Sequence, residues 1–99
     1  MVDVIIKRSH RADKKYDAII DGKKTVSFGA KGYSDYTLHK DSERKQKYID
    51  RHKTNEDWTK EGIKTAVFYS RWILWNKPTL ASNIDDTNKR YKNIKIKLK

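Results

Sequence analysis

The chain has 99 residues, the size of one small domain, and its 24 Lys and Arg against 13 Asp and Glu give a formal charge of +11. Only 35% of the residues are apolar, so no stretch approaches the ~20 apolar residues of a membrane-spanning helix. The absence of cysteine excludes a disulfide framework, a thiolate nucleophile and cysteine-ligated zinc.

The N-terminal third predicts strands. Val2, Val4 and Ile6 alternate with Asp3, Ile5 and Lys7, which suits a strand with one face buried. Residues 9–15 are polar enough for a loop. Asp21-Gly22 is a turn signal between two further strands. A three-residue turn that includes Lys23 would bring the apolar residues of both strands onto one side, so we expect that register.

Helical patterns follow the glycine-rich turn at residues 29–32. We expect a helix over residues 42–53 that Asp41 or Ser42 caps, a short capped turn over residues 54–62, and a central helix over residues 63–75. Pro78 ends one helix and begins the next, whose apolar stripe runs from Leu80 to Tyr91. Residues 92–99 are either an edge strand or a basic tail, since Ile or Leu alternates with Lys from Ile94 to Lys99.

These elements predict one α+β domain spanning residues 1–99. Its small antiparallel sheet combines the N-terminal strand with the hairpin, takes in the C-terminal strand if that segment is not a tail, and packs on three to four helices.

The central helix carries large side chains on both faces, which leaves its role open. It is either covered on two sides, by the sheet and by other helices, or it exposes an aromatic and basic surface. Such a surface would bind nucleic acid through Lys64 and Arg71, or bind a protein. The protein-interface candidates are Phe68, Trp72 and Trp75.

Basic residues gather in clusters, and the last thirteen residues contain no acid. Such clusters neutralise phosphates without reading sequence, and we expect them to lie on one continuous flank. A further cluster surrounds the first loop. The remaining nucleic-acid-binding candidates are Arg44, Lys45, Lys47 and Arg51 in the first long helix, and Lys89, Arg90, Lys92, Lys95 and Lys97 near the C-terminus.

Catalytic signals are weak. The histidines lie in separate elements, and we predict neither a cofactor nor a resident metal. Asp85 and Asp86 are spaced to pair with basic residues one helical turn later. A nuclease-type Mg²⁺ site built around His39 is a distant alternative, with oxygen ligands from Asp35, Asp41 and Glu43.

Three strings carry a resemblance: Phe28 to Asp41, Gly62-Ile63-Lys64-Thr65-Ala66, and Ser70-Arg71-Trp72-Ile73-Leu74-Trp75-Asn76-Lys77-Pro78. From about Val26 to Leu80 the chain resembles a family of short basic proteins of uncharacterised function encoded by nucleocytoplasmic large DNA viruses. The resemblance implies a viral origin and localisation in the virion and the infected cell, and it transfers no catalytic residue.

The sequence therefore favours a non-enzymatic viral protein that binds nucleic acid, DNA in the first instance, through backbone phosphates and without sequence preference. Genome packaging is the expected setting, and we expect neither membrane insertion nor secretion. The alternative is a structural protein of the virion that dimerises, or docks acidic virion proteins, through its aromatic face.

Overall fold

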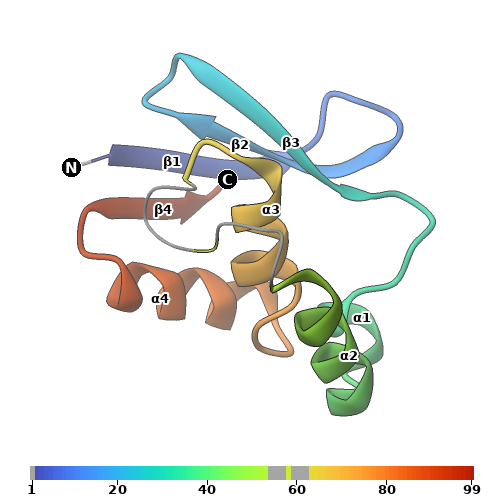
Figure 1. Ribbon diagram of the computed structural model, residues 1–99. Coiled ribbons are helices and arrows are strands. Elements are labelled where there is room, and N and C mark those ends of the chain that lie inside the picture. Colours follow the sequence, from blue (N-terminus) through green and yellow to red (C-terminus); the bar gives the residue numbers. More distant parts are fainter. Residues whose placement is uncertain (1, 54–57, 59–62) are drawn as a thin grey trace.

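The computed structural model describes residues 2–53, 58 and 63–99. A four-stranded sheet has the order β3-β2-β1-β4, and its strands are β1 Val2–Arg8, β2 Lys14–Ile20, β3 Lys24–Ala30 and β4 Ile94–Leu98. The helices lie on one side of this sheet, as Figure 1 shows. The predicted α+β class is confirmed.

The hairpin between β2 and β3 has the predicted three-residue turn. Ile20 pairs with Lys24, and Ala18 pairs with Val26, so the apolar residues of both strands face the helices. Asp21 and Gly22 adopt positive φ angles of 51° and 68° in this turn, a conformation in which glycine carries no steric cost.

The C-terminal segment is an edge strand and no tail. β4 pairs with β1 in parallel, with Val4 opposite Ile96, because the chain crosses the helical layer before it returns to the sheet. The sheet is therefore mixed, and the antiparallel arrangement expected from the sequence holds only for β1, β2 and β3.

The helical layer departs from expectation in its centre. The predicted continuous helix over residues 63–75 is instead a short α-helix followed by a π-helical segment, and it begins only at Ala66. The helix over residues 42–52 forms as predicted, with its cap from Asp41. The last helix also forms, but Thr79 caps it, so Pro78 precedes that helix and does not begin it. The predicted capped turn over residues 54–62 falls largely outside the described residues. The elements are α1 Tyr36–His39, α2 Ser42–His52, α3 Ala66–Tyr69, η2 Ser70–Leu74 and α4 Leu80–Arg90.

The core lies between the inner face of the sheet and the α3–η2 segment. Phe68, Tyr69 and Ile73 have no exposed surface, and Phe28 of β3 packs against the ring of Tyr69. The central segment is thus covered on two sides, the first of the two roles that its sequence left open. Within the described part of the chain, no helix combines the length and the apolar character that crossing a bilayer requires.

Candidate nucleic-acid interface

A buried asparagine of α4 fixes the turn that follows η2. The Asn83 side chain donates hydrogen bonds to the carbonyls of Ile73 and Lys77 and accepts one from the Lys77 backbone N–H. Asn83 has no exposed surface, so these contacts replace water at every polar atom of its amide. The turn therefore presents the exposed side chain of Lys77 beside α4.

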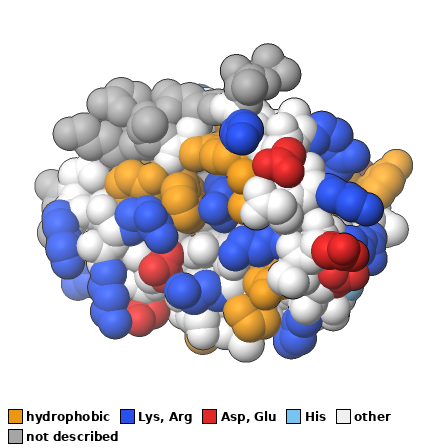
Figure 2. All heavy atoms as spheres, turned by 60° about the horizontal axis from the view of Figure 1, so that its bottom comes forward, with side chains coloured by type: hydrophobic (Ala, Val, Ile, Leu, Met, Phe, Trp, Pro, Cys, Tyr) orange, Lys and Arg blue, Asp and Glu red, His pale blue; other side chains and the backbone are white. Residues whose placement is uncertain are grey.

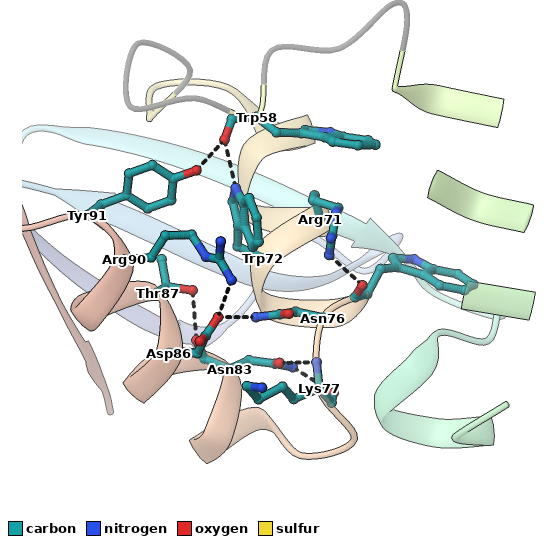
Figure 3. Close-up of polar contacts among 11 residues, drawn as sticks. Trp58, Arg71, Trp72, Asn76, Lys77, Asn83, Asp86, Thr87, Arg90 and Tyr91 are labelled. Carbon is teal, nitrogen blue, oxygen red and sulfur yellow. Dashed lines mark hydrogen bonds and ion pairs between the residues drawn. The ribbon is translucent and has the colours of Figure 1, made fainter. Parts of the chain in front are cut away.

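The indole of Trp72 in η2 lies between two guanidinium groups. The Cζ atoms of Arg71 and Arg90 each lie 4.4 Å from its ring centre, and Figure 3 shows the two side chains on either side of the ring. Arg71 also lies 5.4 Å from the ring of Trp58 and donates a hydrogen bond to the carbonyl of Trp75. These contacts hold both cations in place, and among the described residues no carboxylate pairs with Arg71.

One acid, Asp86 of α4, lies within this group of cations. It accepts hydrogen bonds from Asn76 and Arg90, which outweigh the effect of its burial and lower its pKa. The neighbouring charge of Lys77 lowers the pKa of Asp86 further. Asp86 is therefore ionised at neutral pH and already committed to Arg90, in agreement with the predicted pairing one helical turn apart.

Lys45 of α2 lies near the same group of cations. Its Nζ atom lies 5.1 Å from the ring centre of Tyr36, and the residue is half-buried. Burial lowers the pKa of Lys45, and the positive charges of Arg71 and Lys77 lower it further. The cations of three elements are thus close enough to destabilise one another's charge.

We call Lys45, Arg71, Lys77 and Arg90 the basic site. Among the described residues, Arg90 is the member of this set with an ion pair, and Asp86 is its partner. Figure 2 shows Lys and Arg side chains around apolar ones on the face formed by the bottom of Figure 1. A concentration of cations that lowers the pKa of one of its own members favours the binding of an anion.

The structure brings together part of the residue set expected from the sequence. Lys45, Arg71 and Arg90 meet in the basic site, whereas Lys64 precedes α3 and Lys89 forms an exposed ion pair with Asp85. The other candidates on α2 lie on different sides of that helix from Lys45, and Lys92 lies in the turn after α4. These α2 residues are Arg44, Lys47 and Arg51.

The expected continuous basic flank is wrong. Ile94 and Ile96 of β4 are buried toward the helices, so the alternating Lys95 and Lys97 point to the opposite face of the sheet. Sequence proximity at the C-terminus therefore does not place these lysines beside Arg90.

The exposed aromatic interface expected from the sequence is wrong for two of its three members. Phe68 is fully buried, and Trp72 is 8% exposed with cations next to its ring. Trp75 is half-buried and stacks on Tyr48 at 4.4 Å between ring centres. The rings thus support the core and the cations, and leave little aromatic surface for a protein partner.

Two of the three acids proposed for a Mg²⁺ site, Asp35 and Asp41, have structural roles. Asp35 caps α1, receives a hydrogen bond from Lys15 and is buried, while Asp41 caps α2. His39 accepts a hydrogen bond from the backbone of Asp41 through Nδ1. In the described ranges, no group of three metal-ligating side chains converges.

Sequence reasoning missed Lys77 as a member of the basic site. Lys77 stands in the Asn76-Lys77-Pro78-Thr79 break, which the sequence pattern marks as a helix boundary and not as a binding segment. Its position in the sequence could have identified it. A turn between two helices that contains proline has a restrained backbone, so it holds a lysine in a defined position at the surface.

Comparison with known proteins gives a match over part of the chain. A family model described as a family of unknown function (DUF5754) matches residues 4–52, which cover most of β1 and all of β2, β3, α1 and α2. No curated protein and no solved structure matches the chain. Of the basic site, only Lys45 lies within the matched segment.

Proposed function

We propose that this protein binds nucleic acid, duplex DNA in the first instance, by accepting backbone phosphates at the basic site. The observation that carries the proposal is the meeting of Lys45, Arg71, Lys77 and Arg90 from α2, η2, the following turn and α4, with one carboxylate among them. An incoming phosphate relieves the repulsion among these cations, and the release of its counterions adds to the affinity.

The arrangement of the rings favours contacts with phosphates over contacts with bases. Trp72 has a cation over its ring on either side, and Trp75 stacks on Tyr48, so these rings are engaged within the protein. Base recognition requires an open ring face or a donor set aimed at base edges. The proposed binding is therefore independent of base sequence.

The chain's resemblance to proteins of large DNA viruses extends the proposal to a setting. We propose that the protein acts without catalysis in packaging a viral genome, within the virion and the infected cell. A protein of net charge +11 that contacts phosphates without sequence preference is suited to coat packaged DNA.

Fluorescence anisotropy with a labelled random duplex tests the binding. The double variant Lys45→Gln/Lys77→Gln is expected to bind at least about tenfold more weakly at moderate salt, because it removes two phosphate contacts. Within the part of the chain that the structure describes, neither lysine side chain donates a hydrogen bond to a buried acceptor, so the variant is expected to keep the fold.

The matched control is Lys95→Gln/Lys97→Gln, which removes the same charge from the outer face of the sheet. It is expected to reduce duplex affinity by less than about threefold, the residual effect of net charge. Equal losses from both double variants would show that total charge alone causes binding, and the proposed site would be rejected.

A further inference from the structure

The two edges of the sheet differ in the pairing of their outward-facing backbone groups. At the β4 edge, the side chain of Asn88 donates to the carbonyl of Ile96 and accepts from its backbone N–H. At the β3 edge, within the part of the chain that the structure describes, no group outside the sheet bonds the backbone of Thr25 or Ser27. β3 is therefore an open edge, with which another strand can pair.

The hydrogen bonds of β2 show which groups of β3 point outward. The N–H of Ser9, just after β1, donates to the carbonyl of Lys15, so the odd-numbered residues of β2 bond to β1. Bonded residues alternate in an antiparallel ladder, and the even-numbered residues of β2 and β3 consequently bond to each other. Thr25 and Ser27 alternate with these, so their N–H and carbonyl groups face the free edge. Thr25 is exposed and Ser27 is half-buried, which leaves this edge accessible.

Cations surround the free edge of β3. Lys24 begins the strand and Lys31 follows it, and both are exposed. A cleft of about 560 Å³ adjoins the C-terminal end of the strand, and its lining joins Ala30 to Arg44 and Arg51, which are exposed on one face of α2. Among the described residues, no carboxylate forms an ion pair with any of these four cations. The edge and its C-terminal end therefore carry positive charge that an incoming anion can neutralise.

This charge selects among the partners that an open edge could bind. Antiparallel pairing of two copies, each of net charge +11, would bring Lys24 of one copy close to Lys31 of the other, and the repulsion disfavours it. The acid that lines the cleft, Asp35, is already paired with Lys15. A segment rich in Asp or Glu would supply the missing negative charge and the backbone partners together.

We propose that an extended acidic segment of a partner protein adds to the free edge of β3 as a fifth strand, with its carboxylates on the surrounding cations. In this mode of recognition the main-chain hydrogen bonds provide affinity, and the side chains of the added strand provide specificity. The proposal goes beyond nucleic-acid binding, because it concerns residues outside the basic site and stands whether or not that site binds DNA.

Amide hydrogen exchange of the full chain, followed by NMR, tests the added strand. The probe is an acetylated and amidated heptapeptide that alternates Glu with Val, because this pattern favours an extended backbone with a row of carboxylates. In the free protein, the amides of Thr25 and Ser27 are expected to exchange at least about tenfold faster than those of Val26 and Phe28. Saturating peptide should slow exchange at Thr25 and Ser27 at least about tenfold, and at Val26 and Phe28 much less. Absence of peptide binding, or binding without this alternating protection, would overturn the proposal.

Thr25→Pro tests the hydrogen bonds of the edge. It removes an outward-facing N–H and leaves the ladder between β2 and β3 in place, so peptide affinity is expected to fall at least about tenfold. The matched control, Thr25→Ala, keeps that N–H and should stay within about twofold of the unmodified chain. Circular dichroism checks the fold, and a folded proline variant with full peptide affinity would contradict the assignment.

Arg44→Gln/Arg51→Gln tests the charge at the end of the edge, and it decides if Thr25→Pro unfolds the chain. Peptide affinity is expected to fall at least about fivefold. Lys95→Gln/Lys97→Gln removes the same charge from β4 at the opposite edge of the sheet, and should reduce affinity by less than about twofold. Equal losses from the two double variants would show that the peptide responds only to net charge, and the assignment to β3 would be rejected.

The fully N-methylated peptide separates strand addition from attraction by charge. It keeps every side chain but has no backbone donor, and should bind at least about tenfold more weakly, whereas equal affinity would refute strand addition. Two further outcomes would also refute the acidic segment as the occupant. Protection of Thr25 and Ser27 that grows with protein concentration in the absence of peptide would assign the edge to a second copy, and the same protection by a DNA duplex would assign it to nucleic acid.

Discussion

The guanidinium carbon of Arg90 lies 4.4 Å from the ring centre of Trp72, so a residue of α4 rests on a ring supplied by η2. The indole N–H of Trp72 donates to the carbonyl of Trp58. The Trp72 side chain thus connects η2 to α4, supports a cation of the basic site and donates a hydrogen bond to the backbone at Trp58 (Figure 3).

Replacing Trp72 separates these roles. Trp72→Phe keeps a ring beside Arg71 and Arg90 but removes the indole N–H. It is expected to lower the free energy of unfolding, measured in urea, by about 1–2 kcal/mol. Trp72→Leu also removes the ring, and is expected to weaken duplex binding several-fold more than Trp72→Phe. A folded leucine variant with the duplex affinity of the phenylalanine variant would show that the ring does not position the cations.

The pKa of Lys45 is a direct measure of the charges in the basic site. Its pKa is lowered by burial and by the charges of Arg71 and Lys77, so an anion bound among them should raise that pKa. NMR titration of the lysine side chains should show Lys45 of the unbound protein losing its proton below the ordinary lysine pKa of about 10.4. Lys77→Gln and added duplex should each move the Lys45 titration upward, and no movement with duplex would place the bound phosphates elsewhere.

Asp17 of β2 makes the free energy of unfolding depend on pH in the acid range. Burial alone would raise its pKa, but hydrogen bonds from Ser9, His10 and Ser27 outweigh burial and hold the pKa well below its ordinary value. A lowered folded-state pKa contributes stability above the unfolded pKa of about 3.9, and this contribution is lost as pH falls below it. The free energy of unfolding should therefore decline below about pH 4.

Guanidinium unfolding from pH 7 to acid checks this contribution. Asp17→Asn should be less stable at pH 7 and should show a flatter decline in acid. The matched control is Asp13→Asn, whose carboxylate is 65% exposed and pairs only with Arg11 among the described residues. An Asp17→Asn profile parallel to that of the unmodified chain would contradict the role of these hydrogen bonds.

The free edge of β4 is closed by a side chain. The Asn88 amide donates to the carbonyl of Ile96 and accepts from its backbone N–H, so the outward-facing polar groups of that residue are paired. Asn88→Ala should cost about 1–3 kcal/mol and promote edge-to-edge association. Light scattering against concentration measures that association, with the exposed Asn93→Ala as control. An Asn88→Ala variant that is as stable as the unmodified chain and associates no more than it does would refute the role.

Gly29 in β3 tests the packing of the sheet on η2. Its φ is +77°, and an added Cβ would lie 2.8 Å from Leu74 Cδ1 and 3.2 Å from Lys15 Cβ. Gly22, at φ +68°, has no atom within 4 Å of such a Cβ. Gly22→Ala should lower the free energy of unfolding by about 1–2 kcal/mol, from backbone strain alone. Gly29→Ala should lower it clearly more, and thermal unfolding measures both variants. Equal costs would show that Leu74 moves aside freely.

The sequence predicted what local patterns determine. The register of β2 and β3 followed from the need to place Ala18 and Val26 on one side, and the Asp41 cap followed from residue type at a helix start. The parallel pairing of β4 was not predictable from its alternation, because an alternating strand fits either direction. The π-helical turn of η2 likewise has no sequence period of its own.

The candidate site was only partly predictable for a related reason. Charge density along the chain drew attention to Lys95 and Lys97, but strand alternation turns them away from Arg90. Lys45, Lys77 and Arg90 come from three separate segments, and only the packing of α2 and α4 about Trp72 and Trp75 brings them together. Such long-range juxtaposition leaves no local signal.

The most direct test of the basic site is the salt dependence of duplex binding. The logarithm of the association constant should fall linearly with the logarithm of the salt concentration, by about 0.9 for each neutralised phosphate. The Lys45→Gln/Lys77→Gln variant should show a slope shallower by about 1.8, whereas Lys95→Gln/Lys97→Gln should keep the slope of the unmodified chain. Identical slopes for the two double variants, or no binding of duplex at low salt, would contradict the account.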